Sequence, residues 1–335
     1  MREKPTISVV VCTHNRAALL RQALDSLAGQ TLDRARYEVI VVNNGSTDET
    51  PSVVRAFQVT EHACSLRLVD EPALGLGYAR NTGWKAAKGE YVAFMDDDAK
   101  ADPSWLERAL QLFENGRPSP VAVGGQIRPW YVSPKPAWFK DEYEVRSWGC
   151  QARPLSAGES FSGSNMIFAK QVLQEFGGFE VNVGMRGTRI SMGEETVLFR
   201  RISESFGDRA ILLYDPELIV YHAVSRRKMT ARYHLSRWFV AGQVACRLDA
   251  PASFRERLSR LRAGVTAIRR LMGAALEQRK LFPNYRSWMV ERLGPVALET
   301  GRLLAGMGLH LSVRRPEFTA DLHPGGSTAR QWSFR

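Results

Sequence analysis

The chain has 335 residues, of which 44% are hydrophobic, so it can form one large domain with a smaller appendage, or two domains. It contains no run of about 18 apolar residues and no secretory or organellar targeting pattern, which argues against a membrane-spanning protein and favours the cytoplasm. Four scattered cysteines without a CxxC pair argue against a zinc site or disulfide framework, and the net charge of +11 indicates an acidic partner.

Strands and helices are predicted to alternate over the first hundred residues. Apolar, β-branched runs at 7–12, 37–42, 65–70 and 91–95 predict buried strands. The intervening segments predict helices at 17–27, up to about Phe57, and at 78–87. This alternation is typical of an open parallel α/β sheet with right-handed crossovers.

Polar clusters follow three of these strands, at Thr13–Arg16, Asn43–Asp48 and Asp96–Asp98. In open α/β sheets, ligands bind beyond the carboxyl ends of the strands. The sequence therefore predicts that the three clusters converge on one binding site.

The acidic cluster is the most informative of the three. Three adjacent carboxylates repel one another, and a divalent cation would relieve that repulsion. Mg²⁺ and Mn²⁺ prefer carboxylate oxygens and share their coordination shell with phosphate oxygens. Asp96–Asp98 therefore indicates a metal–diphosphate site, although an acidic turn after an edge strand would give the same pattern.

Aromatic residues and prolines are interleaved between Arg128 and Trp148. This stretch predicts an irregular segment that covers a site or stacks on sugar rings. The alternative is that the aromatic side chains fill the core of a subdomain.

The C-terminal third is strongly basic. Residues 1–225 hold 25 basic and 28 acidic residues, whereas residues 226–335 hold 21 basic and 7 acidic residues. Apolar residues spaced by three and four from Phe254 to Met272, with arginines on other faces, predict a basic amphipathic helix. A second helix is predicted at 288–308. The first helix would lie on an anionic membrane surface, or pack on the catalytic domain or a second subunit.

The ordered segments together resemble the family-2 inverting glycosyltransferases of the GT-A fold. The matching segments are Ser8–Arg16 (SVVVCTHNR), Glu38–Thr50 (EVIVVNNGSTDET), Gly75–Gly89 (GLGYARNTGWKAAKG), Glu90–Asp98 (EYVAFMDDD), Gly163–Phe168 (GSNMIF) and Gly193–Arg201 (GEETVLFRR).

The resemblance implies an α/β GT-A fold, with a mostly parallel Rossmann-like sheet flanked by helices. It implies a transferase domain at 1–245, divided into a nucleotide-sugar half at 1–115 and an acceptor-side half at 116–245. A basic α-helical region follows at 246–335.

The resemblance also assigns residues to the nucleotide sugar. Thr13 and Asn15 would lie by the base, and Arg80 would approach the diphosphate. Where the family usually has aspartates near the base or ribose, this chain has Asn43 and Asn44. The full implied set is Thr13, Asn15, Arg16, Asn43, Asn44, Arg80, Asp96 and Asp97.

The metal site follows from the family's DXD motif. Asp96 and Asp98 match its outer residues, and His222 resembles a histidine that completes the metal shell in many relatives. The implied cofactor is Mn²⁺ or Mg²⁺. A single histidine near a strand end can equally be structural.

The base is expected in the pair Glu194-Glu195, at a place where the family usually has Glu-Asp. Glu195 is the first candidate because the second residue is usually the base, and Glu194 is the other. Without the resemblance, the pair would read as acids in the first turn of a helix.

The expected function is metal-dependent, inverting transfer of a sugar from a UDP-, GDP- or dTDP-sugar to a saccharide or lipid-linked acceptor. Such transfer would serve polysaccharide, glycolipid or other glycoconjugate assembly in the cytoplasm or at the inner membrane face. The alternatives are a non-catalytic nucleotide-sugar or lipid-binding module and a sugar nucleotidyltransferase. Nucleic acid is not expected as a partner. The sequence leaves the oligomeric state open between a monomer and a homo-oligomer. The residues do not indicate which sugar, base or acceptor is used.

Overall fold

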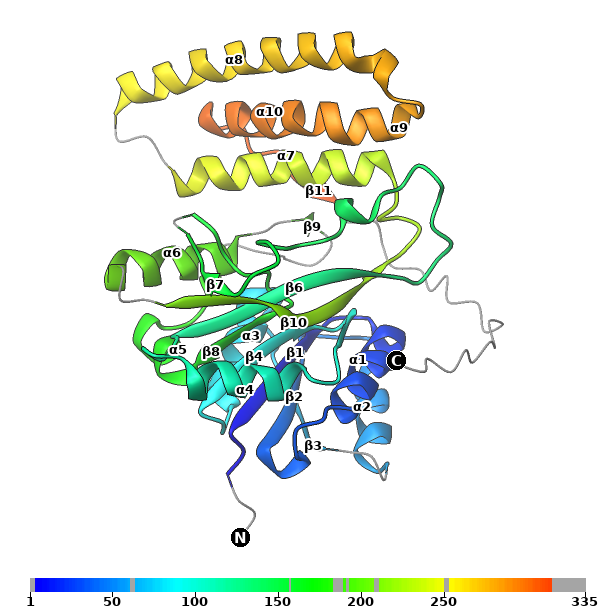
Figure 1. Cartoon of the computed structure of the whole chain (residues 1–335), viewed down its shortest axis with the longest axis vertical. Helices are drawn as coiled ribbons and strands as arrows, with labels where there is room; N and C mark the ends of the chain where they lie inside the picture. The colour runs from blue at the N-terminus through cyan, green and yellow to red at the C-terminus, as the bar shows by residue number, and fades with distance from the viewer. Residues whose placement is uncertain are drawn as a thin grey trace.

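A computed structural model describes residues 4–60, 64–156, 158–182, 189–190, 193–207, 211–249 and 253–314. Its centre is a twisted nine-stranded sheet in the order β3-β2-β1-β4-β8-β6-β10-β5, with β7 paired to β10 (Figure 1). The strands of this sheet are β1 (Ile7–Thr13), β2 (Tyr37–Asn43), β3 (Ser65–Asp70), β4 (Tyr91–Asp96), β5 (Ala99–Ala101), β6 (Ala122–Tyr131), β7 (Arg153–Pro154), β8 (Met166–Ala169) and β10 (Leu212–Val224). The GT-A architecture expected from the sequence is confirmed.

The first four strands are parallel, as predicted, and their register aligns the polar residues at their ends. Thr13 lies opposite Asn43, and Asn43 lies opposite Asp70. Cys12 lies opposite Asp96 on the other side of β1. The carboxyl ends of β1 to β4 therefore form one row of polar groups. Beyond β4 the sheet becomes mixed, because β8 pairs antiparallel to both β4 and β6.

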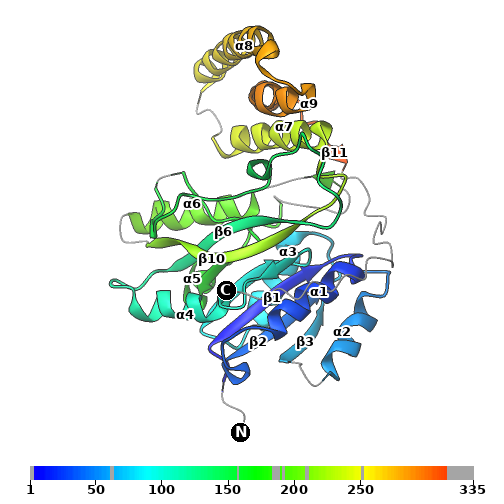
Figure 2. The same ribbon diagram turned by 45° about the vertical axis from the view of Figure 1, so that its right-hand side comes forward.

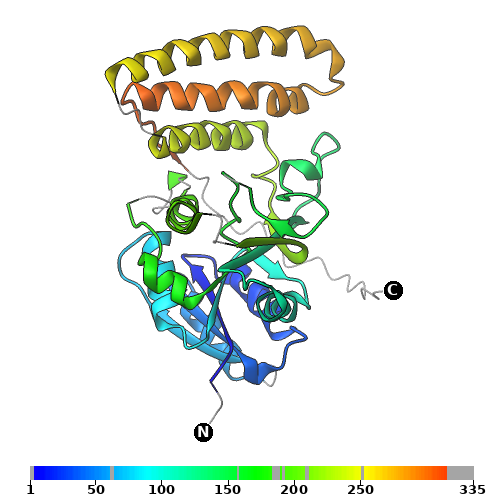
Figure 3. The same ribbon diagram turned by 60° about the vertical axis from the view of Figure 1, so that its left-hand side comes forward.

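Six helices cover the two faces of the sheet (Figure 3). They are α1 (Ala17–Ala28), α2 (Thr50–Gln58), α3 (Leu76–Ala86), α4 (Trp105–Asn115), α5 (Lys170–Phe176) and α6 (Glu194–Phe206). Successive strand residues point to opposite faces. Val9 and Val11 thus pack with α1, α2 and α4, whereas Val10 packs with α3, α5 and α6.

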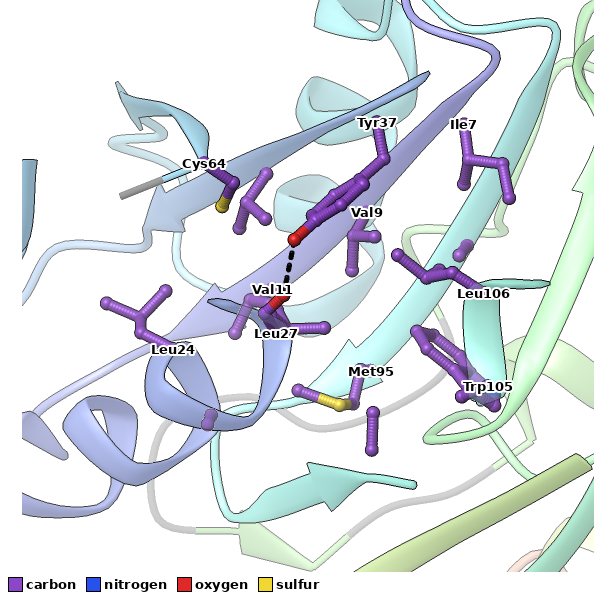
Figure 4. Close-up of a cluster of buried hydrophobic side chains, with 14 of the residues drawn as sticks. Ile7, Val9, Val11, Leu24, Leu27, Tyr37, Cys64, Met95, Trp105 and Leu106 are labelled. Carbon is purple, nitrogen blue, oxygen red and sulfur yellow. Dashed lines mark hydrogen bonds between the residues drawn. The ribbon is translucent and has the colours of Figure 1, made fainter. Parts of the chain in front are cut away.

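Figure 4 shows the first of these cores, where Leu24 and Leu27 of α1 meet Val9 and Val11 of β1. The Tyr37 hydroxyl is buried there and donates a hydrogen bond of 2.7 Å to the carbonyl oxygen of Leu27. This bond satisfies a polar group that would otherwise be costly to bury.

A layer of helices lies beyond the sheet, with α8 outermost in Figures 1 and 2. Its helices are α7 (Ala231–Leu248), α8 (Phe254–Glu277), α9 (Tyr285–Trp288) and α10 (Gly294–Gly306). Added Cβ atoms at Gly242 and Gly301 would collide with backbone carbonyls of the facing helix. These glycines therefore let α7 and α10 pack closely. No described helix is both long and apolar enough to cross a membrane.

The helix predicted at 288–308 is divided in two. Residues Met289–Leu293 form a π-helical turn, and α10 begins only at Gly294, with a proline in its first turn. Proline cannot donate a backbone hydrogen bond, so it favours a new start there. The predicted domain boundary at residue 245 falls inside α7.

The aromatic stretch forms a core. Trp138 and Phe139 are buried against Val290, and the Tyr143 hydroxyl donates to Glu291 at 2.6 Å. The core-filling alternative therefore applies to these residues, whereas Trp148 remains 39% exposed. A short two-stranded sheet joins β9 (Arg189–Ile190) to β11 (Val313–Arg314), just before α6.

Candidate active site

The side chains of Asp96–Asp98, the acid triplet, point toward two different sets of partners. Asp96 and Asp98 approach His222 of β10, and one ligand atom from each of the three lies within 4.8 Å of the others. His222 Nε2 is 3.2 Å from Asp98 Oδ1 and 3.6 Å from Asp96 Oδ2. Asp97 instead accepts a 2.7 Å hydrogen bond from Arg16. Two carboxylates and an imidazole suit a divalent cation such as Mn²⁺ or Mg²⁺.

The charges around Asp98 keep it ionised. Burial alone would raise its pKa, but His222, Lys228 and Arg16 hold the pKa of Asp98 well below its usual range. Burial opposes the charged form of His222 as well, yet Asp98 and Asp96 raise the pKa of that imidazole. A metal ion bound at Nε2 would replace this proton, as metal binding commonly does.

Lys228 is a site residue that the sequence reasoning missed. Its ammonium group is buried and donates to Ala223 O at 2.6 Å and to Asp98 Oδ2 at 3.3 Å. It also lies 3.1 Å from Nδ1 of His222. A lysine in a basic stretch gives no signal of this position, because its carboxylate partner lies 130 residues earlier.

Arg80 of α3 joins the acid triplet to the glutamate pair. Its guanidinium donates to Glu194 Oε1 at 2.8 Å and lies 3.8 Å from Glu195 Oε2 and 3.7 Å from Asp96 Oδ1. Both glutamates lie in the first turn of α6, which begins after Gly193 in a left-handed conformation (φ 109°). The structure thus brings Arg80, Asp96 and the glutamate pair together.

The two glutamates differ in burial. The Glu194 side chain is 4% exposed, and burial followed by the neighbouring Glu195 raises the pKa of Glu194 to about 8, against the opposing charge of Arg80. The Glu195 side chain is 21% exposed. Of the pair, Glu195 is therefore the carboxylate that a bound molecule can reach.

Gly163 makes room for Arg80. A Cβ atom at this position would collide with the Arg80 guanidinium. We expect Gly163→Ala to displace Arg80 and lower the donor kcat/KM by roughly 100-fold, since small misplacements at a reaction centre have effects of this size. The measurement is steady-state kinetics on the donor.

The matched control is Gly273→Ala, because an added Cβ at Gly273 meets nothing within 4 Å. Equal kinetics for the two alanine variants would contradict a role for the Arg80 position.

The polar ends of β1 and β2 hold one another in place. The Thr13 carbonyl accepts from the Asn44 N–H at 2.9 Å, and the Asn15 side chain accepts from the Thr47 N–H at 2.7 Å. Asn43 donates to Asp70 Oδ1 at 2.8 Å. Asp70 was not singled out from the sequence, although its place at the end of a predicted strand was a usable signal.

Asn44 uses both of its amide N–H donors and its amide oxygen in hydrogen bonds within the protein. Its amide nitrogen donates to Glu71 O and Ala73 O, and its amide oxygen accepts from Gly75 N–H. Arg16 is similarly engaged, with Asp97 at 2.7 Å and Asp98 at 3.3 Å. The predicted nucleotide contacts of Asn44 and Arg16 therefore remain predictions, and both side chains hold the site together.

Comparison with known proteins gives the family. The family model described as "Glycosyl transferase family 2" matches residues 8–176. The chain belongs to glycosyltransferase family 2. This family-2 enzyme is 33% identical over 226 residues to the glucosyl-dolichyl phosphate glucuronosyltransferase of Haloferax volcanii, covering 64% of this chain and 68% of the relative. It is 28% identical over 248 residues to the succinoglycan biosynthesis protein ExoM of Rhizobium meliloti, covering 73% and 75%.

Two solved structures share the fold of this family-2 glycosyltransferase. One is the mannosyltransferase PcManGT from Pyrobaculum calidifontis in complex with GDP-Man and Mn²⁺, with a TM-score of 0.61 and 22% identity over 90% of this chain and 88% of that chain. The other is S. aureus TarS 1–349, with a TM-score of 0.51 and 15% identity over 91% and 92%. At such identities the likeness shows the fold alone.

Proposed function

We propose that this glycosyltransferase moves a sugar from a nucleotide-diphosphate donor to a hydroxyl acceptor, with inversion and with a divalent cation. The observation that carries the proposal is the convergence of Asp96, Asp98 and His222, one strand away from Thr13 and linked through Arg80 to Glu195. This arrangement supports a donor site beside a base.

Asp96, Asp98 and His222 would hold Mn²⁺ or Mg²⁺. When bound, the cation would neutralise the negative charge that develops on the departing diphosphate. Arg80 adds a fixed positive charge beside the same carboxylates. Thr13, Asn15 and Asn43, with Asp70 beside them, would lie on the base and ribose side of the donor.

Glu195 would act as the general base. The acceptor hydroxyl has a pKa far above neutrality, so its proton must leave as the new bond forms. Glu194 would hold Arg80, since its carboxylate is already bonded to that guanidinium. One displacement, without a covalent intermediate, inverts the anomeric configuration.

A nucleotide-sugar screen tests this function. The protein with MnCl₂ or MgCl₂ should release nucleoside diphosphate from one of the UDP-, GDP- or dTDP-sugars, and EDTA should stop the release. Release from none of them, or release that EDTA leaves unchanged, would contradict the metal-dependent proposal.

We propose a lipid-linked acceptor. Its support is the similarity to a relative whose name specifies a dolichyl phosphate substrate, together with the helical layer beyond the sheet. We place the start of this helical region at α7, because α7 packs closely on α10.

The outer face of α8 would bind an anionic membrane surface. Apolar side chains recur on it at spacings of four and seven, and arginines at a spacing of seven lie alongside. The apolar residues are Phe254, Leu258, Val265, Met272 and Leu276, each at least 37% exposed, and the arginines are Arg255, Arg262 and Arg269. An apolar groove of about 400 Å³ between α8 and α10 continues this surface. The basic charge favours anionic lipid over a second copy of the same face.

We expect vesicle binding to depend on these arginines. Replacing Arg255, Arg262 and Arg269 by glutamine should weaken partition onto vesicles containing phosphatidylglycerol by about 100-fold, at about 1 kcal/mol for each charge. Pelleting with vesicles measures this, and high salt should weaken wild-type binding.

The matched control replaces Arg21, Arg36 and Arg55, which are exposed on the catalytic domain. Equal pelleting of both triple variants would mean that α8 is not the binding face.

A further inference from the structure

A second buried charged cluster lies between the sheet and α7. It is connected to the acid triplet through Lys228, whose ammonium contacts Asp98 and whose backbone forms a hydrogen bond with the His234 side chain. His234 Nε2 lies 3.8 Å from Glu144 Oε1, and Arg237 donates to the same oxygen at 3.4 Å. The cluster thus begins beside the donor site and extends to the helical layer.

Positive charge exceeds negative charge in this cluster. Glu144 is buried and pairs with Arg237. Arg146 lies on the strand-like segment that pairs with Ile127. Among the residues that the structure describes, its guanidinium donates only to the carbonyls of Tyr143 and Val145. No carboxylate forms an ion pair with Arg146 in that part of the chain. Two guanidinium groups therefore lie near one carboxylate, which forms an ion pair with only one of them.

Burial and the excess of positive charge shift the pKa values of two side chains in this cluster. Burial, and then the nearby Arg237, lower the pKa of Arg146 to about 10. Burial and the positive charges of Arg237 and Arg146 lower the pKa of His234 to about 4, although the negative charge of Glu144 opposes this shift. His234 Nε2 is also buried and has no hydrogen-bond partner among the described residues. Arg146 is half-buried, and Glu144, which already pairs with Arg237, balances its charge only in part. An incompletely balanced charge away from water is destabilising, so an external anion would stabilise this site.

We propose that Arg146 and Arg237 bind the phosphate group of the acceptor. Guanidinium groups match phosphate oxygens through paired N–H donors, so the two arginines together could hold one phosphate group. The Arg237 side chain is 26% exposed, so a ligand can reach it. Arg146 lies on the acceptor-side half of the chain, and Arg237 lies on α7. Lys228 and Glu144 come between these arginines and the acid triplet, so the proposed phosphate site is separate from the donor diphosphate.

This inference rests on the proposed transfer, since it assigns the acceptor, but its test needs no donor. The test titrates the full chain with farnesyl phosphate, with farnesol and with inorganic phosphate by isothermal calorimetry. Farnesyl phosphate should bind at least about 10-fold more tightly than farnesol. Inorganic phosphate should compete with it, at lower potency.

Arg146→Gln and Arg237→Gln should each weaken farnesyl phosphate binding by about 10-fold or more, and Arg237→Lys should give a smaller loss. Arg270→Gln, the same change on the exposed surface of α8, should have no effect. Both cluster variants should retain the wild-type melting temperature and the wild-type affinity for nucleoside diphosphate with Mn²⁺.

Three results would overturn the proposal. The first is unchanged farnesyl phosphate binding in the Arg237→Gln variant. This variant should fold normally, because the Arg237 side chain is partly exposed. The second is an equal loss of nucleoside diphosphate binding, which would place the arginines in the donor site. The third is equal potency of inorganic and farnesyl phosphate, which would remove the lipid assignment. Each can occur while donor cleavage persists, so it is distinct from failure of the proposed transfer.

Discussion

Replacing Asp98 by asparagine should lower the release of nucleoside diphosphate by about 1,000-fold or more. The change keeps the size of the side chain but removes the charge that faces His222 and Lys228. Stabilisation of a leaving group by a metal contributes several kcal/mol, and each 1.36 kcal/mol is a factor of ten in rate. The measurement is the initial rate with the donor identified in the screen, at saturating MnCl₂.

Asp25→Asn provides the matched control, because Asp25 lies on the exposed face of α1 and pairs only with Arg21 among the described residues. It should keep the wild-type rate. A wild-type rate for the Asp98→Asn variant, with an unchanged melting temperature, would contradict a catalytic metal site at Asp98.

The second large effect is expected at Glu195. Glu195→Gln should lower transfer to an acceptor by about 100- to 10,000-fold, the usual contribution of a positioned base. Donor and Mn²⁺ affinities should stay near the wild-type values, because the amide keeps the shape of the side chain. The measurement combines transfer kinetics with calorimetric titration of nucleoside diphosphate and Mn²⁺.

Glu194→Gln separates the two glutamates. It removes the carboxylate bonded to Arg80 at 2.8 Å, so it should weaken donor binding as well as slow transfer. If Glu194→Gln abolishes transfer with unchanged donor binding while Glu195→Gln transfers normally, the base is Glu194.

The row of polar residues at the sheet edge could be predicted because it depends on the pattern of the strands. The β-branched runs fix parallel strands, and parallel strands bring Thr13, Asn43 and Asp96 to one edge. The first four strands and the core positions follow from the same pattern. Arg80, His222 and the glutamate pair could be placed only through the family resemblance, because nothing in their local sequence indicates their partners.

The remaining features depend on contacts between distant segments. The approach of Lys228 to Asp98 and of Tyr143 to Glu291 joins residues more than a hundred positions apart. The aromatic stretch has no periodicity that distinguishes a core from a binding surface. Only the structure shows that Trp138 and Phe139 lie in a core. The π-helical turn at Met289–Leu293 also has no pattern of its own, although the proline that follows it marks a break.

The metal site can be observed by anomalous scattering from crystals grown with MnCl₂ and the released nucleoside diphosphate. We expect a manganese peak at about 2.1 Å from the ligand atoms of Asp98 and His222, with the diphosphate bound to the same ion. A diphosphate bound at the ends of β1 and β4 without manganese at Asp98, or a manganese peak only elsewhere on the protein, would contradict it.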